Sequence, residues 1–133
     1  MASCDGLVGL AEGDLTRRFG EPTSRRTLGP DTWVVFASRN MSLRIRLTGD
    51  PVPKVASWTA SFETGFRQLS DAARTVGLWP AAGPEEDASG ITLPLVRRAL
   101  PCPGSDRVYS LTATVRQGRF KALSVFDEYP DWL

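Results

Sequence analysis

The sequence predicts an α+β domain in which two short helices pack on a mainly antiparallel sheet. Residues 42–47 and 54–62 alternate apolar with polar side chains, which is typical of strands with one buried face. Over residues 64–76 apolar side chains recur every three or four positions, the spacing of an amphipathic helix. A second apolar stripe ends at Gly20 and Pro22, which indicates another helix that stops there.

The first predicted helix covers residues 11–19. Its apolar stripe runs from Leu7 to Phe19 with spacings of three to five residues. Gly20 tolerates the left-handed conformation that ends many helices, and Pro22 cannot continue a helix.

Three strands are predicted to follow. Residues 32–37 are rich in β-branched and aromatic side chains, which favour strands, and residues 38–41 form a hairpin loop. Residues 42–47 place Leu43, Ile45 and Leu47 on one face and Ser42, Arg44 and Arg46 on the other. Residues 54–62 repeat this alternation, which predicts three strands of one antiparallel sheet.

A second helix and an edge strand are predicted next. Residues 64–76 form the helix, with Gly77 as its cap. Residues 80–90 contain three consecutive acids and are predicted to be an exposed, solvated loop. The alternation over residues 91–95 predicts a strand, and Pro94 places it at a sheet edge because proline lacks an amide donor.

The last predicted elements form a hairpin. Residues 109–115 and 119–126 are its strands, and Gln117 and Gly118 are its turn. The predicted order is therefore helix, three strands, helix, three strands. We expect a single domain over residues 1–133, with a possible duplication into structural halves 1–63 and 64–133.

Composition excludes several kinds of chemistry. The chain has no histidine, so Ser-His-Asp and Cys-His catalysis and His-ligated metal sites are excluded. Two cysteines cannot complete a zinc site alone, and we expect neither a metal nor a cofactor. Sixteen Lys and Arg balance fifteen Asp and Glu, and no nucleic-acid-binding signature is present, so no nucleic-acid partner is expected.

Localisation depends on the N-terminus. No apolar stretch is long enough for a transmembrane helix, and no apolar signal core follows Met1, so a native start at Met1 predicts a cytoplasmic protein. Ala2-Ser3-Cys4 resembles the end of a bacterial lipoprotein cleavage box. In that alternative, Cys4 anchors an envelope lipoprotein. Whether Cys4 and Cys102 are free, paired or lipidated is left open.

Arginines are the first candidate binding residues. Arg44 and Arg46 share the polar face of one strand, and Arg116 and Arg119 flank a hairpin turn. Guanidinium groups bind carboxylates and phosphates with two parallel hydrogen bonds, so these four residues are candidates for an anion-binding or partner-binding surface. The alternative is that they keep an exposed sheet face soluble and block edge pairing.

The C-terminal segment supplies the other candidates. Asp127, Glu128 and Asp131 are expected in a solvated acidic tail, the alternative being paired carboxylates for acid–base chemistry or a cation site. Trp132 either docks on the body of the domain or binds a partner. With the four arginines, Asp127, Glu128 and Trp132 complete the predicted partner-binding set, and no catalytic residue is predicted.

The opening block resembles a known pattern. Leu7-Val8-Gly9-Leu10 precedes a short helix that ends at Arg18-Phe19-Gly20-Glu21-Pro22, and Trp33 starts a hairpin. This resembles the small outer-membrane assembly lipoproteins (the SmpA/OmlA family) and the structurally related β-lactamase-inhibitor-like proteins. The resemblance covers residues 6–62, and Ala11-Glu12-Gly13 departs from it. It implies a helix on an antiparallel sheet that contacts other proteins without catalysis.

The predicted function is therefore non-enzymatic: a protein-binding or adaptor protein that recognises another protein. One alternative is a small-ligand-binding protein or weak enzyme with arginines and carboxylates in a sheet-lined cup. Another is an immunity or antitoxin-like protein. The sequence gives neither the partner nor the oligomeric state.

Overall fold

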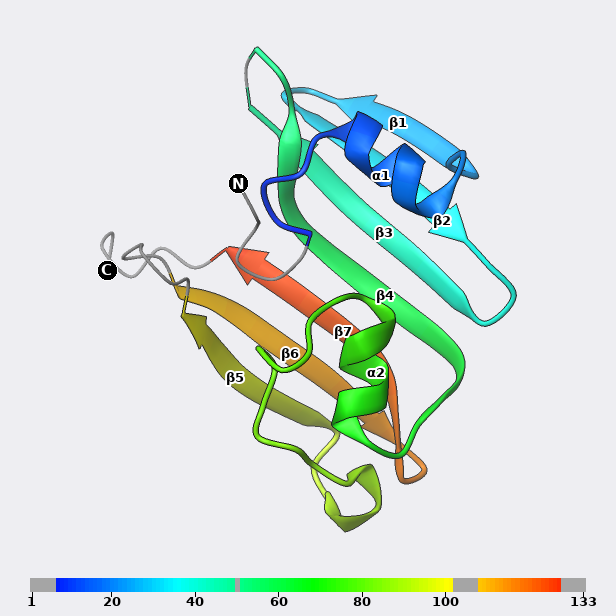
Figure 1. Cartoon of the computed structure of the whole chain (residues 1–133), viewed down its shortest axis with the longest axis vertical. Coiled ribbons are helices and arrows are strands. Elements are labelled where there is room, and N and C mark those ends of the chain that lie inside the picture. The colour runs from blue at the N-terminus through cyan, green and yellow to red at the C-terminus, as the bar shows by residue number, and fades with distance from the viewer. Residues whose placement is uncertain (1–6, 50, 102–107, 128–133) are drawn as a thin grey trace.

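The computed structural model describes residues 7–49, 51–101 and 108–127 (Figure 1). In chain order the elements are α1 Glu12–Phe19, β1 Ser24–Leu28, β2 Asp31–Ala37, β3 Met41–Thr48, β4 Lys54–Phe66, α2 Leu69–Thr75, the 3-10 helix η1 Ala88–Gly90, β5 Leu95–Pro101, β6 Val108–Arg116 and β7 Arg119–Asp127. The helices are short relative to the sheet, so the protein is a mainly-β member of the predicted α+β class.

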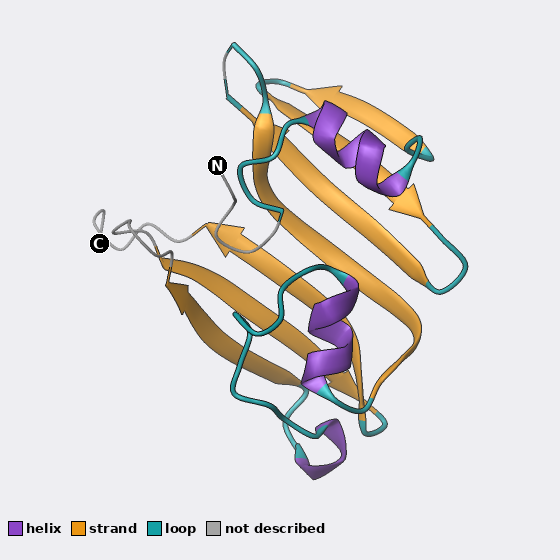
Figure 2. Ribbon diagram, viewed as in Figure 1, coloured by secondary structure: helices purple, strands orange, loops and turns teal. Residues whose placement is uncertain are grey.

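All seven strands form one antiparallel sheet in the order β1-β2-β3-β4-β7-β6-β5. Strands β1 to β4 follow one another as a meander, and β5 to β7 form a second meander that pairs with the first through β4 and β7. Figure 2 shows that α1 and α2 lie on the same face of the sheet. We call this the covered face, and the opposite one the open face.

The core fills the space between the helices and the covered face. Ile45, Trp58, Val125 and Leu111 are successive cross-strand partners on β3, β4, β7 and β6, and all are at most 2% exposed. Side chains along each strand point alternately to the two faces, so every second side chain is apolar and buried. Each large side chain buried in this way stabilises the protein by about 1.5–3 kcal/mol. Leu15 of α1 and Leu69 of α2 close the core from the helical side.

An arginine lies at each end of this apolar row. Arg25 of β1 pairs with Val34, the neighbour of Ile45, and Arg98 of β5 pairs with Leu111. The Arg25 Nε donates to Glu12 Oε2 of α1 at 2.9 Å, and this hydrogen bond raises the pKa of Arg25. Both edges of the sheet are thus connected to the helical layer through a guanidinium group.

The second helix begins later than the spacing of its apolar residues predicts. Strand β4 continues to Phe66, and α2 covers only Leu69–Thr75. Gly65 has a φ of +83°, and a Cβ there would lie 2.8 Å from the Phe120 carbonyl oxygen. Phe62 and Phe66 contact each other edge to face, with ring centroids 5.0 Å apart. The three-to-four-residue spacing here reflects an irregular strand end, where the register shifts.

Two further expectations about strands are corrected. Residues 24–28, for which the sequence predicts no strand, form β1, so the first half of the chain has four strands instead of three. All five side chains of β1 are exposed, which leaves no burial pattern in the sequence. The edge strand expected at residues 91–95 begins only at Leu95; the Pro94 carbonyl accepts a bond from the Val115 amide just before it.

The other elements agree with prediction. The first helix, the strands at residues 32–37, 42–47 and 54–62, and the final hairpin with its turn are confirmed. In the described part of the chain, no helix has the length and apolar character needed to cross a membrane.

Candidate functional site

The open face carries polar side chains across the whole sheet. The register of the strands aligns one central row of seven residues on this face: Ser24, Val35, Arg44, Thr59, Ser124, Thr112 and Arg97. Each belongs to a different strand, so the row crosses the sheet from one edge to the other. Arg44 and Arg97 are exposed.

Short hydroxyl side chains from β4, β6 and β7 cover much of the middle of the open face, together with Ala122 and the exposed Phe126 of β7. We call the hydroxyl side chains the hydroxyl band: Ser57, Thr59, Ser61, Ser110, Thr112, Thr114 and Ser124. The hydroxyls of Thr59 and Ser124 lie 3.0 Å apart and share a hydrogen bond. Because these side chains are small, longer side chains on the flanking strands extend beyond them.

A cavity of about 350 Å³ lies on the β1–β3 side of the hydroxyl band. We call it the arginine–tryptophan pocket; it is lined by Ser24, Arg26, Leu28, Trp33, Val35 and Arg44. Trp33 and Val35 are half-buried, whereas Leu28 is 55% exposed. Arg26 is the cross-strand partner of Trp33, and Arg44 is the partner of Val35. The pocket therefore combines apolar side chains with two guanidinium groups.

Arg46 lies beside this pocket but has protein partners. Its Nη1 is 3.4 Å from Asp31 Oδ1, and its Nε donates to Ser57 Oγ at 3.2 Å. Both charged side chains of the Arg46–Asp31 pair are about one quarter exposed. This ion pair neutralises Arg46 and orients it between Trp33 and the hydroxyl band.

The predicted arginines fall in two places. Arg44 and Arg46 lie together on the open face of β3, whereas Arg116 and Arg119 flank the β6–β7 turn, where Arg119 Nη1 donates to the Gly65 carbonyl at 3.4 Å. Strand pairing puts this turn about seven residues along β4 from the level of Arg44, or roughly 20 Å. The structure does not join the four residues into one cluster.

The remaining predicted site residues lie at the end of the described chain. Asp127 is the last residue of β7, and its backbone pairs with Tyr109. The side chain of Asp127, Glu128 and Trp132 lie outside the described residues.

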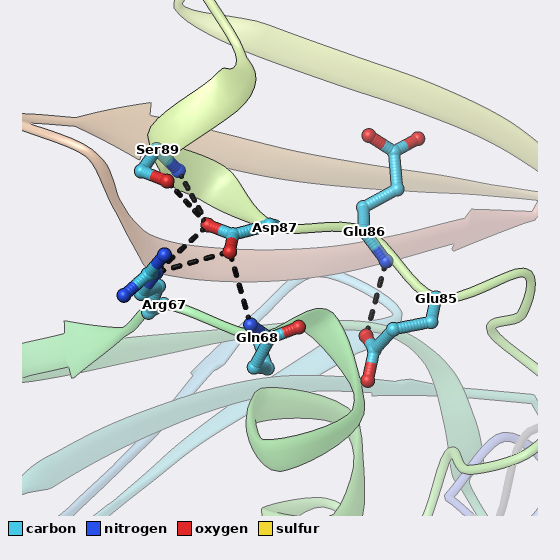
Figure 3. Close-up of polar contacts among 6 residues, drawn as sticks. All are labelled: Arg67, Gln68, Glu85, Glu86, Asp87 and Ser89. Atoms are coloured by element: carbon cyan, nitrogen blue, oxygen red, sulfur yellow. Dashed lines mark hydrogen bonds and ion pairs between the residues drawn. The ribbon is translucent and has the colours of Figure 1, made fainter.

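The acidic segment, expected to be a solvated loop, is instead an ordered connection (Figure 3). Asp87 accepts hydrogen bonds from the Ser89 hydroxyl and amide at 2.6 and 2.9 Å and from Arg67 Nε at 3.0 Å. It also accepts one from Gln68 Nε2 at 3.1 Å. Led by the bond from the Ser89 side chain and then that from Arg67, these contacts hold the pKa of Asp87 well below its ordinary value.

The two glutamates of this segment also have structural partners. Glu85 Oε1 accepts from the Ser70 amide at 2.8 Å, which satisfies an otherwise unpaired donor at the start of α2. Desolvation raises the pKa of Glu85, but the bonds from Ser70 and Glu86 outweigh it and the net shift is downward. Glu86 pairs with Arg98, whose Nη1 also donates to the carbonyls of Ala82 and Pro84. These acids attach the segment to α2 and β5.

Sequence reasoning identified only Arg44 among the pocket residues and missed Ser24, Arg26, Leu28, Trp33 and Val35. Trp33 lies on the open face, whereas Val34 and Phe36 are buried on the covered face. Residues 33–36 are all apolar, so the sequence does not indicate which of them face the core. The residues of β1 also give no signal, because every side chain of that strand is exposed.

Metal-ligand geometry is absent from the described part of the chain. Among residues 7–49, 51–101 and 108–127, no three His, Cys, Asp or Glu side chains are grouped closely enough to hold an ion.

Comparisons with known proteins give limited similarity. No protein-family model matches the sequence, and no curated protein matches it either. Among solved structures, the crystal structure of a cysteine-rich secretory protein from Staphylococcus aureus subsp. aureus Mu50 is similar, with a TM-score of 0.49 and 11% sequence identity. The match covers 90% of this chain and 44% of that one, so this chain spans less than half of that protein's length.

Proposed function

We propose that this chain is a non-enzymatic protein-binding domain and that the open face of its sheet contacts the partner. The observation that carries the proposal is the side-chain row that crosses all seven strands opposite the helices, with exposed arginines and a half-buried tryptophan beside a band of hydroxyls. Arginine and tryptophan are enriched at the centres of protein interfaces, where each supplies both contact area and hydrogen bonds.

The size of the open face supports this proposal. Six inter-strand spacings of about 4.8 Å make the sheet about 29 Å wide, and five of the seven strands have seven to nine residues, a length of about 25 Å, with β1 shorter and β4 longer. The resulting area of roughly 700 Å² is close to the ~800 Å² that each partner contributes to a standard protein–protein interface. The sheet is also a rigid scaffold, so little ordering entropy opposes binding.

The chemistry of the face favours binding over catalysis. The arginine–tryptophan pocket has no carboxylate in its lining, and Asp31 beside it is held by Arg46. General acid–base catalysis needs a titratable group within reach of the substrate, and the acids at residues 85–87 are bound in structural contacts. What the open face offers is hydrogen-bond donors and apolar area.

Site-specific photo-crosslinking tests the proposal. A photoreactive amino acid replaces exposed Ser42 or Ser61 on the open face, and Arg17 of α1 or Arg74 of α2 on the helical side as matched controls. In cells of the source organism, we expect a discrete crosslinked protein from the open-face positions and not from the controls.

Charge reversal supplies the second half of the test. Arg44→Glu/Arg46→Glu is expected to abolish the open-face crosslink. Ser61→Arg, tested with the photoreactive amino acid at position 42, is expected to do the same without breaking the Arg46–Asp31 pair. Circular dichroism and thermal unfolding verify that each variant is folded. Crosslinks that survive both variants, or that form equally from both faces of the molecule, refute the proposal.

A further inference from the structure

We infer that the arginine–tryptophan pocket binds an acidic protein segment, with a carboxylate side chain between Arg26 and Arg44 and a neighbouring apolar side chain against Trp33, Val35 and Leu28. This inference rests on the proposed function and specifies the chemistry of the partner. It follows from the charge pairing of the arginines, from the apolar lining of the pocket and from the distribution of acids over the two faces.

The arginines of β1 to β3 differ in their pairing. Arg25 binds Glu12 on the covered face, and Arg46 binds Asp31 on the open face. Arg26 and Arg44 are exposed, and neither has an ion-pair partner among the described residues. Asp31, the one acid in β1 to β3, is already paired. Two positive charges in the pocket lining are therefore left for an external anion.

The apolar lining limits what kind of anion fits. Trp33 and Val35 lie between the two arginines, and Leu28 is the most exposed large apolar side chain of the three strands. A carboxylate attached to an apolar segment satisfies the guanidinium groups and also removes this surface from water. A free inorganic anion satisfies the guanidinium groups only.

The distribution of charge favours a protein segment over a nucleic acid. The net charge of the chain is +1, and the hydroxyl band beside the pocket is neutral. Nucleic acids bind continuous tracks of cations that neutralise successive phosphates. Two arginines, one on each side of β2, match one or two carboxylates, and the neutral hydroxyl band beside them is available to the backbone and polar side chains of the same segment.

Most acids in the described part of the chain lie on the other side. Glu12, Asp71 and the acids at residues 85–87 belong to the helices or to the segment after α2, in the layer that packs on the covered face. The acids Glu12, Asp71, Glu86 and Asp87 are paired with arginines, whereas Arg26 and Arg44 on the open face have no ion-pair partner among the described residues. An acidic partner is therefore attracted to the open face in preference to the helical layer, which gives the interaction its orientation.

A displayed library of random twelve-residue peptides is the probe. Selection on wild-type protein is compared with selection on Arg26→Gln/Arg44→Gln, and Arg39→Gln, an exposed arginine of the β2–β3 loop, is the matched charge control. We expect wild type and Arg39→Gln to enrich peptides with Asp or Glu next to a Leu, Phe, Tyr or Trp, and the double variant to lose this enrichment.

One enriched peptide is then measured by fluorescence anisotropy. Each single Arg→Gln variant is expected to weaken binding about tenfold, as is replacement of the peptide's acids by amides. Arg39→Gln is expected to bind within twofold of wild type. Binding should change the tryptophan emission of wild type, and this change should be lost in Trp33→Phe.

The outcomes separate this inference from the proposed function. If the enriched peptides are neutral or basic and do not bind Ser61→Arg, the inference of an acidic partner is wrong, but the open face is still a binding surface. Peptides that bind Ser61→Arg and Arg26→Gln/Arg44→Gln as well as wild type overturn both. Failure to enrich any peptide over the double variant overturns the inference, as does equal binding of a twenty-nucleotide single-stranded DNA.

Discussion

The two faces of the sheet use the same strands for different purposes. On β3, Leu43 and Ile45 are fully buried against the helical layer, whereas Ser42 and Arg44, which alternate with them, are exposed on the open face. Apolar burial on the covered face supplies most of the folding free energy. The side chains of the open face contribute little to it, so they can vary for recognition while the fold is kept.

The largest expected difference between the faces concerns two tryptophans. Trp58 is 2% exposed at the centre of the core, and Trp58→Ala should destabilise the protein by about 3–5 kcal/mol, because it loses apolar burial and leaves a cavity. Trp33→Ala on the open face should cost about 1 kcal/mol or less. Urea unfolding followed by circular dichroism measures both. Equal losses would show that the open face is part of the core.

A similar contrast applies to two adjacent arginines of β5. Arg98 is largely buried and holds the segment after α2 through Glu86 and two carbonyls, so Arg98→Ala should cost about 2 kcal/mol. Arg97 faces the open side and bonds Ser110 Oγ at 3.4 Å; Arg97→Ala should change stability by about 0.5 kcal/mol or less. Thermal unfolding compares the two. A larger loss for Arg97→Ala would contradict the assignment of faces.

The contribution of Asp87 should depend on pH. Its pKa in the folded protein lies below the ordinary 3.8, because the charged form accepts bonds from Ser89 and Arg67. The resulting stabilisation is fully present above the pKa of the unfolded state and is lost as the pH falls toward the folded value. The Tm difference between wild type and Asp87→Ala should therefore be constant from about pH 7 to pH 5 and shrink toward pH 2.

Asp71→Ala is the control for that experiment. Asp71 is exposed in α2, and its nearest contact with Arg74 is 3.7 Å. Its Tm difference from wild type should be small, because an exposed ion pair contributes little to stability. A gap for Asp87→Ala that widens in acid would contradict the charged role of Asp87.

The smallest expected effect lies at the β6–β7 turn, outside both faces. Gln117 has a φ of +53° and precedes Gly118 at +73°, a pair of left-handed residues that favours Asn-Gly. Gln117→Asn should stabilise the protein by roughly 0.5 kcal/mol without altering peptide binding. Thermal unfolding measures the gain in stability, and fluorescence anisotropy measures the peptide affinity. A change in affinity would show that the turn affects the binding site.

Burial on one face is what made most of the fold predictable. The alternation of Leu43, Ile45 and Leu47 with polar residues is the pattern expected of a strand with one buried face, and it predicted β3 correctly. Strand β1 has no such pattern in its sequence, because all five of its side chains are exposed and apolar residues do not alternate with polar ones. The late start of α2 was missed because Phe62 and Phe66 have helical spacing but pack across an irregular strand end.

The candidate site was less predictable than the fold. Arg44 and Arg46 could be placed on a polar face from alternation alone. The cross-strand pairing that puts Arg26 beside Trp33 depends on a strand that the sequence does not reveal. The same limit applied to the acids at residues 85–87, whose partners Ser70, Arg67 and Arg98 are 12 to 20 positions away along the chain.

The pairing of β4 with β7 has a consequence for synthesis on the ribosome. Among the strands that the structure describes, β7 comes last in the chain, yet it lies inside the sheet between β4 and β6. The meander β1–β4 therefore emerges with β4 as an unpaired edge, and Trp58 gains its neighbour Val125 only after residue 125 has left the exit tunnel. An unpaired apolar strand is a site for aggregation, so nascent chains that stall before β7 should need the protection of a chaperone.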